Sequence, residues 1–201
     1  KSNFFIIIII IMVELKPDDY IGISFWLISI ALFATTVFLV IERDSVKEKW
    51  KTPTTVAAMV TGIATVHYYY MRHVWVTKQS SPIVYRYIDW FLTVPLQIIE
   101  FYLILAVASK IPITVFYKLL VSSIVMILAG FLGETKMINR MLGFIIGTLA
   151  WFYILYEIIF GEAAKFKDET DDKSVKLAFD SLKYIVTIGW GIYPIGYLLQ
   201  E

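Results

Sequence analysis

Polar and ionisable side chains recur inside one long apolar stretch of this chain, residues 81–107. At about 100° per residue of an α-helix, six of them fall within an arc of roughly 100° on one helix face. They are Arg86, Asp89, Trp90, Thr93, Gln97 and Glu100. The rise from the first to the last is about 21 Å, most of the roughly 30 Å hydrocarbon core of a bilayer. Because ionisable groups at membrane depth are costly, they usually face a protein interior and do chemistry. The spacing therefore predicts a polar track for protons across a membrane.

The two carboxylates of this face have different surroundings in the sequence. Asp89 lies between Arg86 and Thr93 on the helix face, which indicates a charged proton acceptor with a positioned hydroxyl nearby. Glu100 lies about 16 Å further along the axis among apolar residues, so desolvation should keep it neutral and able to donate a proton. The alternative is a buried ion pair of Arg86 and Asp89 that only fixes packing, with Glu100 bonded to another partner.

Composition places this face in a membrane. Hydrophobic residues make up 59% of the 201 residues and charged residues only 17%, whereas soluble domains carry about 25% charged residues. The net charge of +1 offers no basic surface for nucleic acid. The chain has no cysteine, and its two histidines, His67 and His73, are not spaced as metal ligands, so we expect no metal site. The sequence predicts an all-α integral membrane protein.

Several segments are long enough to cross a bilayer as helices. We place them at residues 20–41, 54–76, 81–107, 113–133, 137–160 and 175–199. The connection 161–174 is rich in charge and predicts a solvated loop. Lysine and arginine are more frequent beside the first, third and fifth connections, which predicts an N-terminus outside the cell.

The chain divides into two parts. Residues 1–19 form a leader-like apolar segment, 1–13, followed by a polar break. At about ten residues, the apolar run is too short to span a bilayer. Residues 20–201 form the transmembrane domain.

Aromatic side chains occupy the later segments. Trp190, Tyr193 and Pro194 fall on one face of the last segment, and Pro194 is expected to kink it. Rings at helical spacing are commonly interface anchors or packing residues, but Trp190 sits well inside its segment. His67 lies in the middle of the second segment, where it is either a packing residue or a partner that tunes a proton-accepting aspartate.

Residues 86–96, Arg-Tyr-Ile-Asp-Trp-Phe-Leu-Thr-Val-Pro-Leu, resemble the third helix of microbial rhodopsins. The continuation 100–105 and the run 189–194, Gly-Trp-Gly-Ile-Tyr-Pro, resemble the proteorhodopsin branch of that family. The resemblance extends from about residue 19 onward. It implies a seven-helix rhodopsin-like bundle, of which six transmembrane helices are present, so we expect the chain to lack the seventh. It also implies a light-driven outward proton pump that uses retinal, a transporter rather than an enzyme.

The resemblance assigns a role to each residue of the site. Asp89 would be the counter-ion and primary proton acceptor, paired with His67 and shaped by Arg86 and Thr93, and Glu100 would be the cytoplasmic proton donor. The retinal pocket would be lined by Trp90, Gln97, Met126, Trp151, Trp190, Tyr193 and Pro194. Gln97 falls at the position that sets the colour, where glutamine marks blue-absorbing forms. The lysine that binds retinal as a Schiff base is expected on a seventh helix beyond residue 201.

The family also suggests the setting of the protein. It implies a multi-pass protein of the cell (inner or plasma) membrane whose partners are retinal, protons, the lipid bilayer and further copies of itself in a ring-shaped homo-oligomer. Two other functions remain open from the residues. One is a sensory photoreceptor, and the other is a passive proton channel or a transporter subunit.

Overall fold

The computed structural model describes residues 15–80 and 82–199, so the leader-like segment 1–13 lies outside the described residues. The described part of the chain is helical, without strands, which confirms the all-α class. Five long helices come first: α2 (Tyr20–Glu42), α3 (Glu48–Lys78), α4 (Ile83–Ala106), α5 (Ile113–Glu134) and α6 (Arg140–Ile159). Their bounds agree with the predicted segments to within a few residues, except that α3 begins at Glu48 rather than at residue 54.

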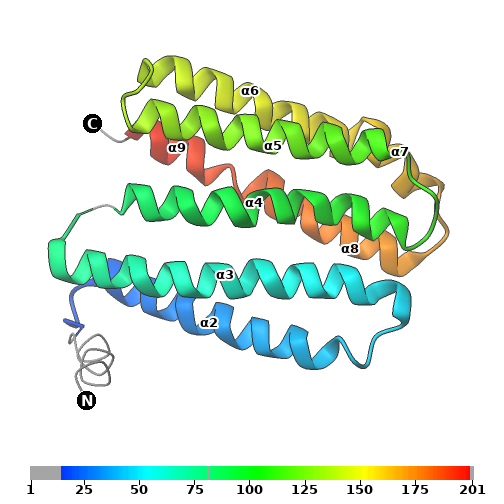
Figure 1. Cartoon of the computed structure of the whole chain (residues 1–201), viewed down its shortest axis with the longest axis horizontal. Coiled ribbons are helices and arrows are strands. Elements are labelled where there is room, and N and C mark those ends of the chain that lie inside the picture. Colours follow the sequence, from blue (N-terminus) through cyan, green and yellow to red (C-terminus); the bar gives the residue numbers. More distant parts are fainter. Residues whose placement is uncertain (1–14, 81, 200–201) are drawn as a thin grey trace.

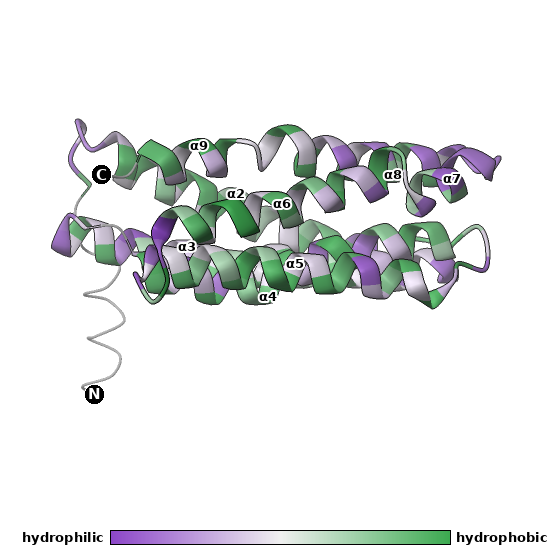
Figure 2. Cartoon of the chain, turned by 90° about the horizontal axis from the view of Figure 1, so that it is seen from above, coloured by the Kyte–Doolittle hydropathy of each residue, from purple (hydrophilic) through white to green (hydrophobic). Residues whose placement is uncertain are grey.

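The helices pack in the order of the chain. α2 lies against α3, α3 against α4, α4 against α5 and α5 against α6, as the nearly parallel rods of Figure 1 show. Figure 2 shows apolar residues along the length of the helices and hydrophilic residues at both ends of the bundle, among them those of α7. Four stretches in the described residues are long and apolar enough to cross a membrane: Tyr20–Glu42, Ile83–Ala106, Ile113–Glu134 and Arg140–Glu169.

The prediction that residues 161–174 form a solvated loop is wrong. These residues contain a helix, α7 (Glu162–Glu169), whose Ala163 is fully buried and whose Ala164 is nearly so. Phe166 of the same helix packs against the core. Lys165, Asp168 and Glu169 are exposed, whereas the small apolar residues of this segment allow it to lie against the bundle.

The last predicted segment, 175–199, is divided into three pieces. These are α8 (Lys173–Tyr184), a π-helical segment η1 (Ile185–Gly189) and α9 (Ile192–Leu199), which follow one another behind α4 (Figure 1). The helix is interrupted at Trp190 and Gly191, and Pro194 falls in the first turn of α9, where its missing N–H leaves no backbone bond unmade. The expected irregularity is present, as a π-helix and a break rather than a simple kink.

The expectation that a seventh helix is missing is not supported by the number of helices. The described residues form eight α-helices and one π-helical segment rather than six helices. The excess comes from α7 and from the division of the last segment, both of which depend on contacts between distant parts of the chain.

α4 lies at the centre of this arrangement. It contacts α3, α5, α7 and α8, and its Ile98 and Phe101 are completely buried. Phe101 packs edge-on against Phe179 of α8, with ring centres 4.9 Å apart. The polar face of α4 is consequently enclosed by neighbouring helices rather than exposed to lipid.

Candidate functional site

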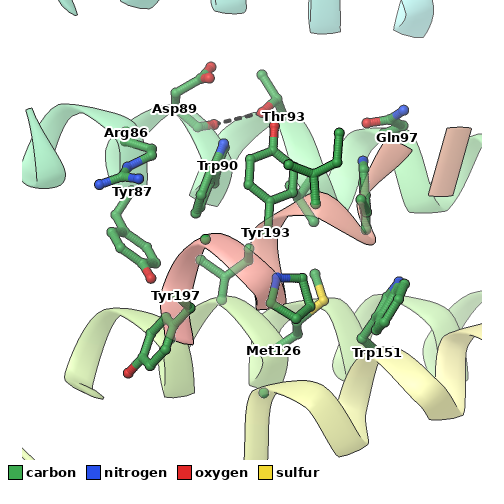
Figure 3. A pocket seen from close by; sticks show the side chains of 18 of the residues that line it. Arg86, Tyr87, Asp89, Trp90, Thr93, Gln97, Met126, Trp151, Tyr193 and Tyr197 are labelled. Atoms are coloured by element: carbon green, nitrogen blue, oxygen red, sulfur yellow. Dashed lines mark hydrogen bonds between the residues drawn. The ribbon is translucent and has the colours of Figure 1, made fainter. Parts of the chain in front are cut away.

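A cavity of about 480 Å³ opens between the helices on the polar side of α4. It falls within the range of roughly 300–1,000 Å³ that is usual for small-molecule pockets. Figure 3 shows Asp89, Thr93 and Gln97 along one wall and Met126 and Trp151 on the facing wall. All seven residues predicted to hold a chromophore line it: Trp90, Gln97, Met126, Trp151, Trp190, Tyr193 and Pro194.

Aromatic rings give the cavity its shape. The rings of Trp90 and Tyr193 meet edge to face, with centres 4.9 Å apart, and so connect α4 to α9. The indole N–H of Trp151 donates to the backbone carbonyl of Val186 at 3.1 Å, within η1. Such walls suit a flat apolar ligand.

Asp89 is the buried carboxylate of this wall, with only 2% of its surface exposed. Its Oδ1 lies 3.7 Å from His67 Nδ1, beyond the length of a direct hydrogen bond. His67 Nδ1 lies 3.0 Å from the carbonyl oxygen of Ile63 on its own helix. Asp89 Oδ1 has no hydrogen-bond partner among the described residues, so one carboxylate oxygen is left for a group that enters the cavity.

Thr93 lies one turn from Asp89 and also lines the cavity. Its hydroxyl donates to the backbone carbonyl of Asp89 at 2.9 Å, the dashed line in Figure 3. This bond fixes the hydroxyl on the helix backbone, in contact with the same turn that carries the carboxylate.

Arg86 also lies in the cavity wall. It forms an ion pair with Glu134, a residue that was not predicted to belong to the site. Its guanidinium is 3.6 Å from the carboxylate of Glu134, whose side chain is only 5% exposed. The guanidinium also lies over the ring of Trp90, with Cζ 5.5 Å from the ring centre. The predicted segment ended at residue 133, just short of Glu134. A carboxylate directly after an apolar segment could have indicated that Glu134 belongs to the end of this helix.

Glu100 is separated from the other residues of its face. It is buried, at 9% exposed, but it is not among the residues that line the cavity. It lies further along α4, toward the end of the bundle at which α7 packs (Figure 1). The structure therefore brings Arg86, Asp89 and Thr93 together in the cavity and holds Glu100 beyond it.

Other residues that line the cavity were not singled out from the sequence, among them Tyr68, Tyr87 and Thr148. No lysine is among the described residues of the cavity wall. Lys183 donates to Asp180 on its own helix at 2.6 Å. The retinal-binding lysine expected beyond residue 201 lies outside the described residues and stays a prediction.

The class of protein follows from this fold and from a match to a known family. The sequence profile described as "Bacteriorhodopsin-like protein" matches residues 19–201. The chain therefore belongs to this family and is a multi-pass membrane protein.

Two curated relatives are similar over most of the chain. The green-light absorbing proteorhodopsin of Gamma-proteobacterium EBAC31A08 is 51% identical over 184 residues, which are 92% of this chain and 74% of the relative. The blue-light absorbing proteorhodopsin of Gamma-proteobacterium Hot 75m4 is 47% identical, over 92% of this chain and 73% of the relative.

Solved structures show the same arrangement. A blue light-absorbing proteorhodopsin from Med12 is 50% identical with a TM-score of 0.75, over 89% of this chain and 80% of that one. Xanthorhodopsin, described as a light-driven ion pump with dual chromophore, is 25% identical with a TM-score of 0.78, over 92% of this chain and 81% of that one.

Proposed function

We propose that this protein is a light-driven proton pump that moves protons out of the cell and carries retinal in the cavity beside α4. One observation supports this function above the others. α4 carries two buried carboxylates in different surroundings, Asp89 in the cavity wall and Glu100 beyond the cavity. An acceptor and a donor on one helix are the parts that directional proton transfer requires.

The cavity fits retinal by its shape and by its chemistry. Trp90, Trp151, Trp190 and Tyr193 would hold the flat apolar molecule, and Asp89 Oδ1 is a buried oxygen without a hydrogen-bond partner among the described residues. Retinal, when bound, supplies the absorption of light. The chain's own residues hold it, exclude water from it and accept or deliver protons beside it.

Asp89 is the proposed proton acceptor. Asp89 lines the cavity, and His67 Nδ1 lies 3.7 Å from its Oδ1, so a second titratable group stands directly beside the carboxylate. A histidine beside a carboxylate stabilises the charged form of that carboxylate when the imidazole is protonated. Arg86 and Thr93 position the same turn of α4, and neither has to exchange a proton for this role.

Glu100 is the proposed proton donor. Its side chain is buried, at 9% exposed, in an apolar stretch of α4 and outside the cavity, where it can hold a proton apart from Asp89. With the N-terminus outside and the protein in the plasma membrane, Asp89 lies toward the outer side and Glu100 toward the cytoplasm. Protons then move outward.

The experiment is light-induced acidification by cells that express the complete gene and are supplied with retinal. We expect the medium to acidify on illumination, and a protonophore to abolish the change. Asp89→Asn should abolish pumping, whereas Glu100→Gln should leave the pigment intact and slow its recovery at least tenfold, because a positioned proton donor contributes about 10²–10⁴-fold to rate. Acidification that persists in Asp89→Asn would contradict the proposal. A slow photocycle that is insensitive to Glu100→Gln would instead favour a sensory photoreceptor.

A further inference from the structure

A third buried carboxylate, Glu157, lies near the end of α6 and takes no part in the proposed proton transfer. It is only 3% exposed. Its Oε1 accepts a hydrogen bond from the hydroxyl of Tyr153 at 3.2 Å, and its Oε2 accepts one from the backbone N–H of Glu162 at 3.1 Å. Glu162 is the first residue of α7, so Glu157 connects the end of one helix to the beginning of the next.

Glu157 caps α7 in place of the usual capping residue. The N-cap position of α7 is Gly161, which has no side chain with which to accept a hydrogen bond from the first turn. A Cβ at Gly161 would lie 2.5 Å from Glu157 Oε2 and 2.6 Å from Glu157 Cα, so a larger residue would displace the carboxylate and also shift the last turn of α6. A carboxylate at this position also complements the positive end of the helix dipole.

Lys118 of α5 completes the arrangement. Its ammonium lies 3.4 Å from Glu157 Oε1 and donates to Glu162 Oε2 at 2.9 Å. We call Lys118, Glu157 and Glu162 the clamp. It joins α5, α6 and α7 at the end of the bundle toward which Glu100 lies.

α7 covers the part of α4 that follows Glu100. Ala163 of α7 is fully buried and belongs to the same core cluster as Phe101 and Leu105 of α4. Phe101 is the residue directly after Glu100 in the chain. α7, at the right-hand end of the bundle in Figure 1, therefore contacts α4, whose residues after Glu100 lead to that same end.

We propose that Glu157 is a positioning residue that holds α7 as a lid over the cytoplasmic approach to Glu100. With the clamp closed, water reaches Glu100 slowly and the donor keeps its proton until it is needed. Release of the lid opens the path from the cytoplasm. The role of the lid in pumping rests on the proposed function, whereas the clamp itself and the access that it controls do not.

Two readouts that need no light test this lid in the complete protein. The first is hydrogen–deuterium exchange of the α7 backbone amides. The second is labelling of Glu100 by a water-soluble carbodiimide with an amine, which must enter from the aqueous side. Asp44, whose side chain is 85% exposed, serves as the internal standard for labelling.

The variants separate the cap from the charge. Glu157→Ala removes both, Gly161→Ala displaces the carboxylate, and Glu157→Gln keeps an acceptor for the Glu162 N–H while removing the charge. Glu169→Gln removes an exposed carboxylate of α7 outside the clamp and is the matched control. We expect Glu157→Ala and Gly161→Ala to raise amide exchange in α7 at least tenfold and Glu100 labelling several-fold. Glu157→Gln should restore most of the protection, and Glu169→Gln should behave as the parent.

If Glu157→Ala leaves the hydrogen–deuterium exchange of the α7 amides unchanged, Glu157 does not hold α7 and the clamp is overturned. Faster exchange without faster Glu100 labelling would overturn the lid. In the photocycle, Glu157→Ala should speed the slow recovery of Glu100→Gln several-fold without moving the absorption maximum, and an unchanged recovery would overturn the lid's part in pumping. If the parent protein shows no light-driven transport, the proposed function fails, while exchange and labelling still decide whether Glu157 holds a lid over Glu100.

Discussion

The guanidinium of Arg86 on α4 lies 3.6 Å from the carboxylate of Glu134, the last residue of α5. Both side chains are largely shielded from solvent, Arg86 at 21% and Glu134 at 5% exposed. The pair therefore joins the first turn of α4 to the end of α5 and holds Arg86 at the cavity wall.

Glu134→Gln should destabilise the protein, because it leaves the positive charge of Arg86 without this partner. Removal of one partner from a buried ion pair costs about 3–5 kcal/mol, and we expect about 2–3 kcal/mol because Arg86 is partly exposed. Thermal unfolding of the purified protein measures the change. The double variant Arg86→Gln/Glu134→Gln should lose less than the sum of the single variants, and simple additivity would show that the pair contributes nothing.

Gly143→Ala should separate α5 from α6. A Cβ at Gly143 would lie 2.6 Å from the carbonyl oxygen of Ala129 and 2.8 Å from Cα of Gly133, both backbone atoms that cannot turn away. We expect a loss of about 1–3 kcal/mol in the free energy of unfolding. Gly196→Ala is the matched control in α9, since its Cβ would meet nothing within 4 Å. It should be neutral or stabilising by up to about 1 kcal/mol, and equal losses in the two variants would contradict this account.

Gln97→Leu should move the absorption maximum of the retinal-loaded protein to longer wavelength. Gln97 lines the cavity, and its amide stabilises the ground-state charge distribution of a chromophore there more than the excited one. Its removal narrows the energy gap. The visible spectrum of the purified pigment measures the shift. Leu92→Val, on an exposed part of α4, should leave the spectrum unchanged, and a Gln97→Leu spectrum identical to that of the parent would refute the assignment.

Asp172 should make the end of the bundle that holds α7 sensitive to acid. The hydrogen bond from Lys49, followed by those from the backbone N–H groups of Ser174 and Val175, holds the pKa of Asp172 below its usual value. Because the folded pKa is depressed, the stabilisation is present above the unfolded value of about 3.9 and is lost as the pH falls through the folded pKa.

Unfolding midpoints between about pH 2 and 6 test this effect. The difference in stability between the parent and Asp172→Asn should shrink as the pH falls below about 4. Asp171→Asn, which replaces the exposed neighbouring carboxylate, should track the parent throughout. A difference that is constant with pH would contradict a depressed pKa for Asp172 in the folded protein.

Helical periodicity was enough to predict much of the site. Asp89, Thr93 and Gln97 share one face of α4 because their spacing in the sequence fixes their angles about the helix axis. The apolar lengths of α2, α4 and α5 fixed where those helices begin and end to within a few residues. These features are local, so the sequence determines them without knowledge of the neighbouring helices.

Contacts between helices account for what could not be predicted. The pairing of Arg86 with Glu134 depends on how α4 and α5 are aligned, which no single segment specifies. α7 was predicted as a loop because its charged residues dominate the composition, whereas its stability comes from Glu157 and from the burial of Ala163. The π-helical segment η1 likewise depends on Trp151 of another helix, which bonds to a carbonyl within it.

The break at Trp190 and Gly191 leaves α8 and α9 anchored to different neighbours. α8 packs on α4, whereas α9 touches α4 through Tyr193 and is also tied to α6 by Tyr197, whose hydroxyl donates to the carbonyl of Arg140 at 3.1 Å. α8 and α9 can therefore tilt separately about the break, which lies beside the cavity. Movement of α8 need not be transmitted to α9, so one end of the bundle can open while the other end stays closed.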